Sequence, residues 1–86
     1  MPEICRFLGI IITMNYNDHA PPHFPARYGS EQAIIEIATL QLLGGRLSPR
    51  VMGLVAEWAL RHRNELLDNW RLARESAPLN RIAPLE

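Results

Sequence analysis

Two halves of the chain meet at the stretch Asn17-Asp18-His19-Ala20-Pro21-Pro22-His23-Phe24-Pro25-Ala26, which holds three of the seven prolines and two of the three histidines. Proline fixes φ, lacks an N–H donor and disfavours helical conformation in the preceding residue. Residues 17–26 therefore cannot form a helix. Four extended residues separate the Cα atoms of His19 and His23 by about 12 Å, unless the prolines fold into a tight turn, for instance through a cis bond. We expect a rigid loop that presents polar groups rather than a ready-made metal site.

Composition limits the class of protein. The 86 residues predict one domain, residues 1–86, with a small core. Nine arginines and no lysine balance nine acidic residues, which argues against strong non-specific binding to nucleic acids or membranes. A single cysteine permits no internal disulfide, and no long apolar run or leader segment is visible. These features predict a cytoplasmic protein without membrane contact.

The first half, residues 1–45, has the composition of a β-sheet. Ile4–Met14 is rich in β-branched residues and predicts one strand, in which Gly9 indicates a bulge or a close approach of another segment. After the loop, further strands are predicted at Phe24–Tyr28, Ala33–Ala38 and Leu40–Leu43, with turns at Gly29-Ser30 and Gly44-Gly45. We expect a three- to four-stranded antiparallel meander.

The second half predicts one long helix over residues 48–75, because Ser48 suits the N-cap position and Pro49 the first helical position. At 100° per residue, one apolar arc collects Val51, Val55, Trp58, Ala59, His62, Leu66, Asn69, Trp70 and Ala73. The opposite arc is charged and contains the i,i+4 pairs Glu57–Arg61 and Arg71–Glu75. Residues 76–86 form an extended tail that either packs back or docks on a partner. The fold class is therefore α+β, a small sheet on one helix.

The proline-rich stretch carries residue types used in proton transfer and phosphate binding. Histidine titrates nearest neutral pH, and arginine binds phosphate through paired N–H groups. The candidate catalytic residues are His19, His23 and Asp18, and the candidate substrate contacts are Asn17, Arg27, Tyr28 and Tyr16. The alternatives are that Asp18 only caps a local turn, that Tyr16 belongs to the core, and that the loop only shapes the fold.

His62 has two alternative roles, since it lies in the middle of the apolar arc. It is either a buried histidine bonded to a main-chain carbonyl, or an additional site residue that the helix brings to His19 and His23. Asn69 lies on the same arc and must find a hydrogen-bond partner if it is buried.

The motif Asn-Asp-His-x-Pro-Pro-His-Phe at residues 17–24, with Arg-Phe-x-Gly-Ile at 6–10, resembles the small bacterial family catalogued as domain of unknown function 4160. The resemblance extends over nearly the whole chain, including the helical segment 62–70. It implies a small protein often encoded beside another domain of unknown function (2442), an arrangement typical of toxin–antitoxin pairs. It also implies a third histidine where this chain has Pro25. The His-x-His metal arrangement is therefore missing, and we expect no zinc site and no cofactor.

Two functions of different classes follow. The first is a toxin-like component of a bacterial type II toxin–antitoxin pair that acts on RNA or a nucleotide, with His19 and His23 as general acid and base and Arg27 on the phosphate. The second is a non-enzymatic interaction module that forms a heterocomplex with a small antitoxin-like partner. The two histidines close to Arg27 favour the toxin, and the neutral net charge of the chain favours the interaction module. A metal-binding protein that uses His19, His23 and Asp18 is a third hypothesis.

Overall fold

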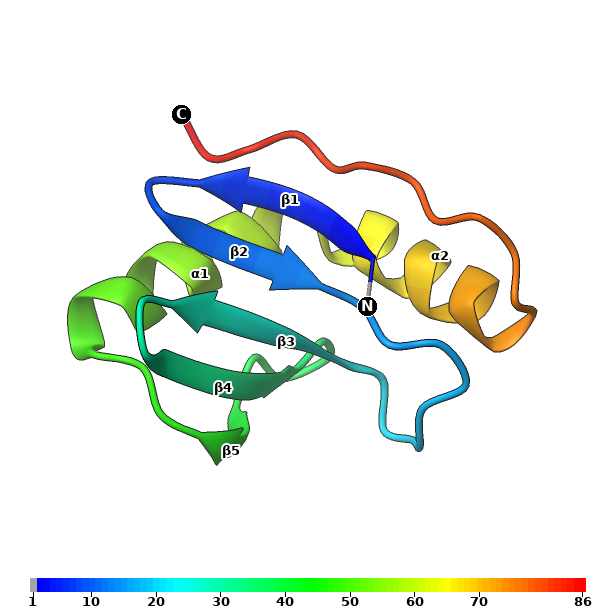
Figure 1. Cartoon of the computed structure of the whole chain (residues 1–86), viewed down its shortest axis with the longest axis horizontal. Coiled ribbons are helices and arrows are strands. Elements are labelled where there is room, and N and C mark those ends of the chain that lie inside the picture. Colours follow the sequence, from blue (N-terminus) through cyan, green and yellow to red (C-terminus); the bar gives the residue numbers. More distant parts are fainter. Residues whose placement is uncertain (1) are drawn as a thin grey trace.

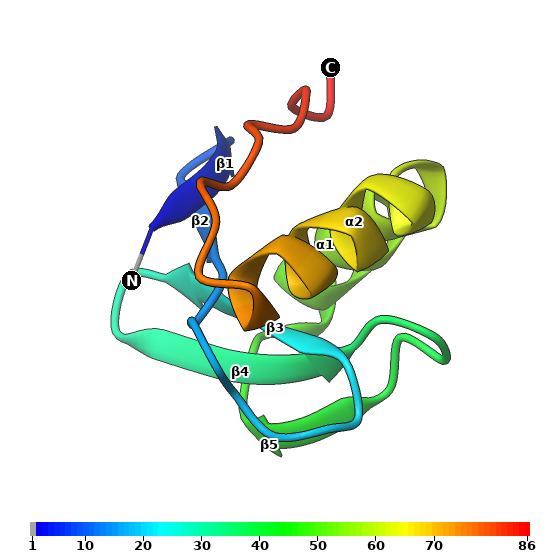
Figure 2. The same ribbon diagram turned by 90° about the vertical axis from the view of Figure 1, so that its right-hand side faces the viewer.

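A computed structural model describes residues 2–86 and shows one five-stranded sheet with two helices on one of its faces (Figures 1 and 2). All neighbouring strands are antiparallel and follow chain order from β1 to β5, so the sheet is a meander. The elements are β1 (Glu3–Phe7), β2 (Ile10–Thr13), β3 (His23–Tyr28), β4 (Glu31–Glu36), β5 (Leu42–Gly45), α1 (Pro49–Arg61) and α2 (Arg63–Arg74). The predicted α+β class is confirmed, with one strand and one helix more than expected.

The extra strand arises because Ile4–Met14 is a hairpin, so the prediction of a single strand there is wrong. Leu8 and Gly9 both have positive φ, +50° and +81°, which is the conformation of a two-residue type I′ turn. Phe7 pairs with Ile10 across this turn. A Cβ atom on Gly9 would lie 3.2 Å from the Tyr28 ring, so the expected close approach at Gly9 is present.

The later strands lie where the sequence places them, with shifted ends. β3 contains the predicted Phe24–Tyr28, and the turn after it begins at Gly29 with a φ of +58°. β5 begins later than predicted because Leu40, at φ +61°, turns the chain. Gly45 belongs to β5 instead of closing it. A Cβ there would lie 2.1 Å from a main-chain oxygen of β4, so only glycine allows this approach.

The predicted helix is divided into two at His62, whose φ of −125° is not helical. Neither proline nor glycine causes the break. Side-chain contacts hold it instead: His62 Nδ1 lies 2.6 Å from Glu65 Oε1, and the His62 ring packs on Trp58 with centroids 5.6 Å apart. Arg63 also donates from Nε to the carbonyl oxygen of Ile37, 3.0 Å away.

Both helices keep the predicted faces. Every residue of the apolar arc except His62 is buried, and Trp58 at its centre has no exposed surface. The Trp58 ring packs against Phe7 and Phe24 from the sheet, with centroids 5.6 and 6.0 Å apart. On the opposite arc, both predicted pairs form, each with an N–O distance of 3.3 Å. Within residues 2–86, neither helix is long and apolar enough to cross a membrane.

The tail, residues 76–86, packs back along β1 and α2 (Figure 2). It has no helix or strand of its own, yet Ile82 and Leu85 are buried in the core. The N–H of Ile82 donates to the carbonyl oxygen of Ile4 at 2.8 Å. The tail therefore covers the outer edge of β1.

Candidate functional site

The proline-rich loop, residues 14–22, joins β2 to β3 and lies beside the end of α2 (Figure 1). The Ala20–Pro21 peptide bond is cis, and Asn17 has a φ of +53°. The N–H of Asn17 donates to the carbonyl oxygen of Ala73 at 3.3 Å, which fixes the loop to the last turn of α2. The expected non-helical loop is present, although His23 and the residues after it belong to β3.

The loop folds back so that Asp18 meets His23, five residues further along the chain. The Asp18 Oδ2 to His23 Nε2 distance is 2.9 Å, and the side chains are 23% and 12% exposed. The other ring nitrogen, Nδ1, lies 2.7 Å from the carbonyl oxygen of Pro21. The His23 ring also packs on Trp70, with centroids 5.0 Å apart. These contacts tie the loop to both the sheet and the helix.

Asp18 accepts two more hydrogen bonds, one from the N–H of His19 at 2.8 Å and one from Asn15 Nδ2 at 3.1 Å. The His19 N–H, then Asn15, then His23 stabilise the carboxylate, so the pKa of Asp18 lies below its usual value. Asp18 thus caps the local backbone, as one alternative predicted, and also pairs with a histidine. That histidine is His23 and not its neighbour His19.

Both nitrogens of the His23 ring face oxygen acceptors. A main-chain carbonyl can only accept, so Nδ1 is the donor to Pro21, and Nε2 faces the Asp18 carboxylate. Both ring nitrogens are therefore engaged within the protein, and His23 holds Asp18 and Pro21 of the loop against the start of β3.

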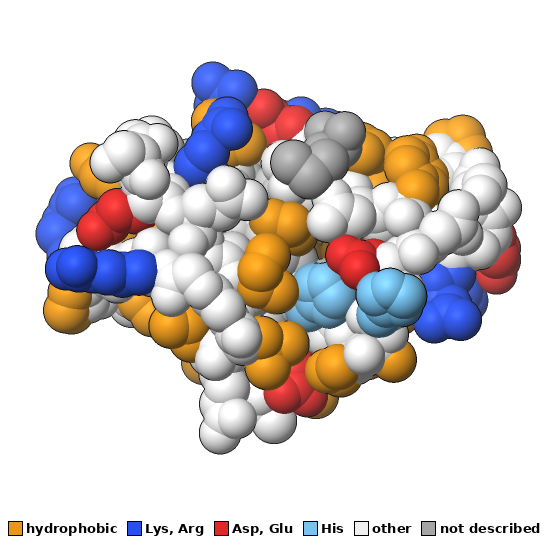
Figure 3. Space-filling view, turned by 60° about the horizontal axis from the view of Figure 1, so that its bottom comes forward, with side chains coloured by type: hydrophobic (Ala, Val, Ile, Leu, Met, Phe, Trp, Pro, Cys, Tyr) orange, Lys and Arg blue, Asp and Glu red, His pale blue; other side chains and the backbone are white. Residues whose placement is uncertain are grey.

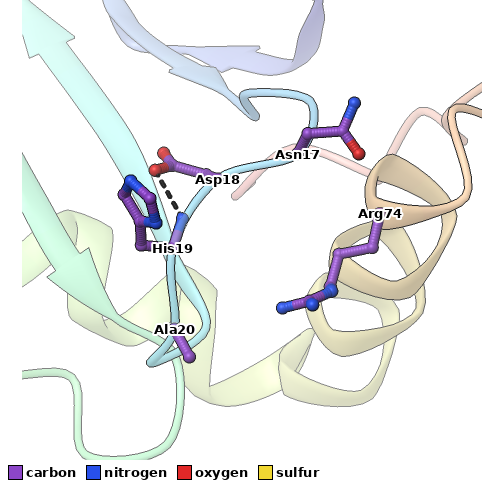
Figure 4. A pocket seen from close by; sticks show the side chains of 5 residues that line it. All are labelled: Asn17, Asp18, His19, Ala20 and Arg74. Carbon is purple, nitrogen blue, oxygen red and sulfur yellow. Dashed lines mark hydrogen bonds between the residues drawn. The ribbon is translucent and has the colours of Figure 1, made fainter.

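An open hollow lies between the loop and the end of α2. It is lined by Asn17, Asp18, His19, Ala20 and Arg74. Figure 4 shows the Arg74 guanidinium reaching toward the loop, whereas the His19 imidazole lies beside the Asp18 carboxylate on the other side of the loop backbone. Figure 3 shows histidine side chains next to an acidic one, with a basic patch beside them. His19 is exposed and its ring makes no hydrogen bond within residues 2–86.

Sequence reasoning missed Arg74. A cation in the last turn of a helix is favoured by the helix dipole, but this signal does not distinguish Arg74 from Arg71. Arg71 pairs with Glu75, whereas Arg74 has no ion pair in the described part of the chain. Only the fold brings this uncompensated charge to the loop.

A family model described as "Domain of unknown function (DUF4160)" matches residues 9–71. The chain belongs to this family. No curated protein and no solved structure matches the chain. The residues matched to DUF4160 contain the Asp18–His23 pair and most of both helices, whereas Arg74 and the tail lie outside them.

The remaining candidates within the DUF4160 match lie away from the hollow. Arg27 is exposed near the far end of β3, and four strand residues separate its Cα from that of His23 by about 13 Å. Tyr28 packs against the turn at Gly9. Tyr16 is 42% exposed, so it is not a core residue, and it does not line the hollow. Among the substrate contacts predicted from sequence, only Asn17 lines the hollow.

His62 lines a separate hollow at the junction of the two helices, together with Arg61, Asn64 and Glu65. Its hydrogen-bond partner is a carboxylate rather than the main-chain carbonyl considered from sequence. The structure does not bring it together with His19 and His23.

No group of three His, Cys, Asp or Glu side chains in residues 2–86 is arranged to hold a metal ion. Pro25, which stands where the family resemblance implies a histidine, is buried in β3 opposite Ile34. Cys5 is buried as well, and burial raises the pKa of its thiol. A raised pKa keeps the thiol protonated, which makes it a poor nucleophile and metal ligand.

Proposed function

We propose that this DUF4160 chain is a non-enzymatic component of a bacterial toxin–antitoxin-type pair in the cytoplasm, and that it binds a small partner protein. The proposed contact surface is the proline-rich loop together with Arg74. The observation that carries the proposal is the network Asp18–His23–Pro21, which holds the loop in one conformation while Asn17 and His19 stay exposed.

A preordered loop favours binding because less conformational entropy is lost when the partner arrives. Both nitrogens of the His23 ring hold this loop, Nδ1 through the carbonyl oxygen of Pro21 and Nε2 through the Asp18 carboxylate. Arg74 adds a cation that has no counter-ion within residues 2–86, and a partner carboxylate would supply one. A guanidinium binds a carboxylate through two parallel hydrogen bonds. The expected partner therefore places an Asp or Glu side chain in the hollow.

Proton chemistry is less well supported. Catalysis by two histidines needs one ring to accept a proton while another donates. Both nitrogens of His23 bond to groups of the loop itself, and the His19 imidazole lies on the other side of the loop backbone from Arg74. The formal net charge of zero also gives no electrostatic attraction for a polyanion such as RNA. Binding of a partner protein needs only the ordered loop and the Arg74 cation, whereas catalysis also needs two histidines placed to exchange protons with a substrate.

The test is co-expression with the product of the adjacent gene, followed by calorimetric titration of the purified proteins. Arg74→Ala should weaken binding by about 10- to 100-fold, since a hydrogen bond to a charged group contributes about 1.5–3 kcal/mol. Arg50→Ala is the matched control, because Arg50 is an exposed helix arginine without an ion pair in the described residues. If Arg74→Ala and Arg50→Ala both bind like the wild type, the loop surface is not the interface.

A second candidate function is a toxin that acts on RNA or a nucleotide. The observation that favours it is that His19 and uncompensated Arg74 both line the hollow. The exposed His19 imidazole lies on the other side of the loop backbone, so this function requires the ring to turn into the hollow. His19 would then serve as a lone general acid or base, and Arg74 would hold a phosphate. Induced expression in bacteria tests this candidate. Growth arrest that His19→Ala and Arg74→Ala abolish, with Arg27→Ala still toxic, would support it, whereas normal growth with the unmutated chain would exclude it.

A further inference from the structure

The tail lies between β1 and the helices (Figures 1 and 2). Side chains of both helices and the main chain of β1 bond its backbone, and this binding surface is here called the groove. The buried amide of Asn69 makes two bonds to one residue: Nδ2 donates to the carbonyl oxygen of Asn80 at 2.8 Å, and Oδ1 accepts from its N–H at 2.9 Å. Trp58 Nε1 donates to the carbonyl oxygen of Ala83 at 2.8 Å. The groove therefore recognises an extended backbone, much as a neighbouring strand would.

The apolar contacts of the tail require that some segment of chain fill the groove. Ile82 is 4% exposed and Leu85 is 9% exposed, and both belong to the core cluster. If the groove were empty, Asn69 would lose both hydrogen bonds while the surface beneath Ile82 and Leu85 met water. Burying apolar surface and pairing buried polar groups both favour a filled groove. One copy of residues 80–85 must therefore be present, but the contacts do not require that it come from the same chain.

The hinge that joins α2 to the tail is short and unusual. α2 ends at Arg74, and Ser76 has a φ of +56°. This is a conformation that residues other than glycine rarely adopt. The N–H of Ala77 then bonds back to the carbonyl oxygen of Leu72 at 2.9 Å. The chain reverses direction within this hinge to reach the groove, and straightening Ser76 would send the tail away from its own groove.

We propose that the tail is exchangeable, and that the groove accepts residues 79–86 of a second copy to form a two-fold dimer. Each groove then keeps the contacts of Asn69, Trp58 and Ile82, and only the two hinges change. Exchange of an identical element costs little because the same contacts form in both states. The groove is formed by β1 together with Trp58 and Asn69, both of which lie within the residues matched to DUF4160. The hinge adjoins the proposed loop surface, because Asn17 Nδ2 donates to Ser76 Oγ at 3.4 Å. The exchange itself does not depend on the partner proposed for that surface.

The first test compares Ser76→Val with Ser76→Gly in the full chain. Both variants lose the serine hydroxyl, so they differ mainly in how well they tolerate a positive φ. Each chain is refolded from denaturant over a range of concentrations, and its mass is measured by size exclusion with light scattering. Ser76→Val should shift the monomer–dimer equilibrium toward dimer by about tenfold or more relative to Ser76→Gly, because a β-branched residue disfavours the closed hinge.

The second test locates the tail. Arg6→Cys and Glu86→Cys are introduced in a Cys5→Ala background that carries one of the Ser76 substitutions, and both new thiols are spin-labelled. The labelled chain is refolded with an excess of unlabelled chain that carries the same Ser76 substitution. Both positions are exposed, and the end of the tail runs beside β1 in the same direction (Figure 1). In a tail-exchanged dimer, the short distance within one chain should be lost. Monomers in both Ser76 variants at every concentration, or a dimer that keeps the short distance, would overturn the proposal.

Discussion

Removing the Asp18 side chain should loosen the proline-rich loop and destabilise the fold. Asp18→Ala deletes three hydrogen bonds, to Asn15, the N–H of His19 and His23. Bonds between neutral groups contribute about 1 kcal/mol each and those to charged groups about 1.5–3 kcal/mol. Because the Asp18 side chain is 23% exposed, solvent screening reduces this sum. We therefore expect a loss of about 2–3 kcal/mol.

For a domain of this size that loss lowers the melting temperature by about 8 to 24 °C, which a thermal melt followed by circular dichroism at neutral pH would detect. Asp68→Ala is the matched control, since Asp68 is the only other aspartate and is exposed on α2 without an ion pair in the described residues. If the two variants melt at the same temperature, Asp18 does not brace the loop and the reasoning fails.

The dependence on pH gives an independent check. The pKa of Asp18 is lowered in the folded chain, so the unfolded state binds a proton at higher pH than the folded state does. The stabilisation is then complete above the ordinary aspartate pKa of about 4 and is lost as pH falls through the lower folded value. The difference in stability between wild type and Asp18→Ala should shrink in acid. A difference that stays constant down to about pH 2 would contradict the assigned role of the carboxylate.

Three further predictions concern the rest of the fold. Trp58→Ala should lower the free energy of unfolding by about 3–5 kcal/mol, measured by chemical denaturation, because the ring is fully buried. A decrease below about 1 kcal/mol would show that Trp58 is not a core residue. Asn69→Ala should cost at least about 2 kcal/mol and speed hydrogen exchange in the tail, whereas exposed Asn64→Ala should do neither. Gly45→Ala should destabilise, since a Cβ would meet the main chain of β4. Gly53→Ala in α1 should stabilise by about 0.5–1 kcal/mol, and equal melting of these two variants would refute the β5 geometry.

Much of the fold was predictable because the signals are local. Helical periodicity places the buried residues of the apolar arc correctly, and Ser48-Pro49 marks the start of α1. The break at His62 was not predictable, since no proline or glycine stands there and the contacts that hold it, with Glu65 and Trp58, depend on packing.

The first hairpin escaped prediction for a similar reason. Type I′ turns are usually recognised by Asn-Gly or Asp-Gly, whereas here the first turn residue is Leu8. Both faces of Ile4–Met14 are largely apolar, and the one glycine, Gly9, was interpreted as a bulge or a close approach, which a single glycine within a strand usually marks. Pairing with the neighbouring strands determines the turn position, and a single sequence does not reveal that pairing.

The candidate site was predictable in location and not in detail. The prolines correctly indicated a rigid loop that carries Asp18, His19 and His23. The sequence left two loop geometries open, one extended and one folded into a tight turn through a cis bond. The loop has the cis bond and folds back, which brings Asp18 to His23, a pairing that the sequence did not predict. Arg74 joins the loop from more than fifty residues away, which only the packing of α2 on the sheet could reveal.

The position of the tail in the groove has a consequence for synthesis on the ribosome. Translation makes β1 before the helices and residues 80–85 after them, so the edge of β1 stays uncovered while the intervening chain is made. Until the tail is made, the chain cannot satisfy the amide of Asn69 or bury the surface beneath Ile82. Exposed apolar surface and an open strand edge promote aggregation. The interval before the tail emerges is therefore when this chain most needs protection by a chaperone.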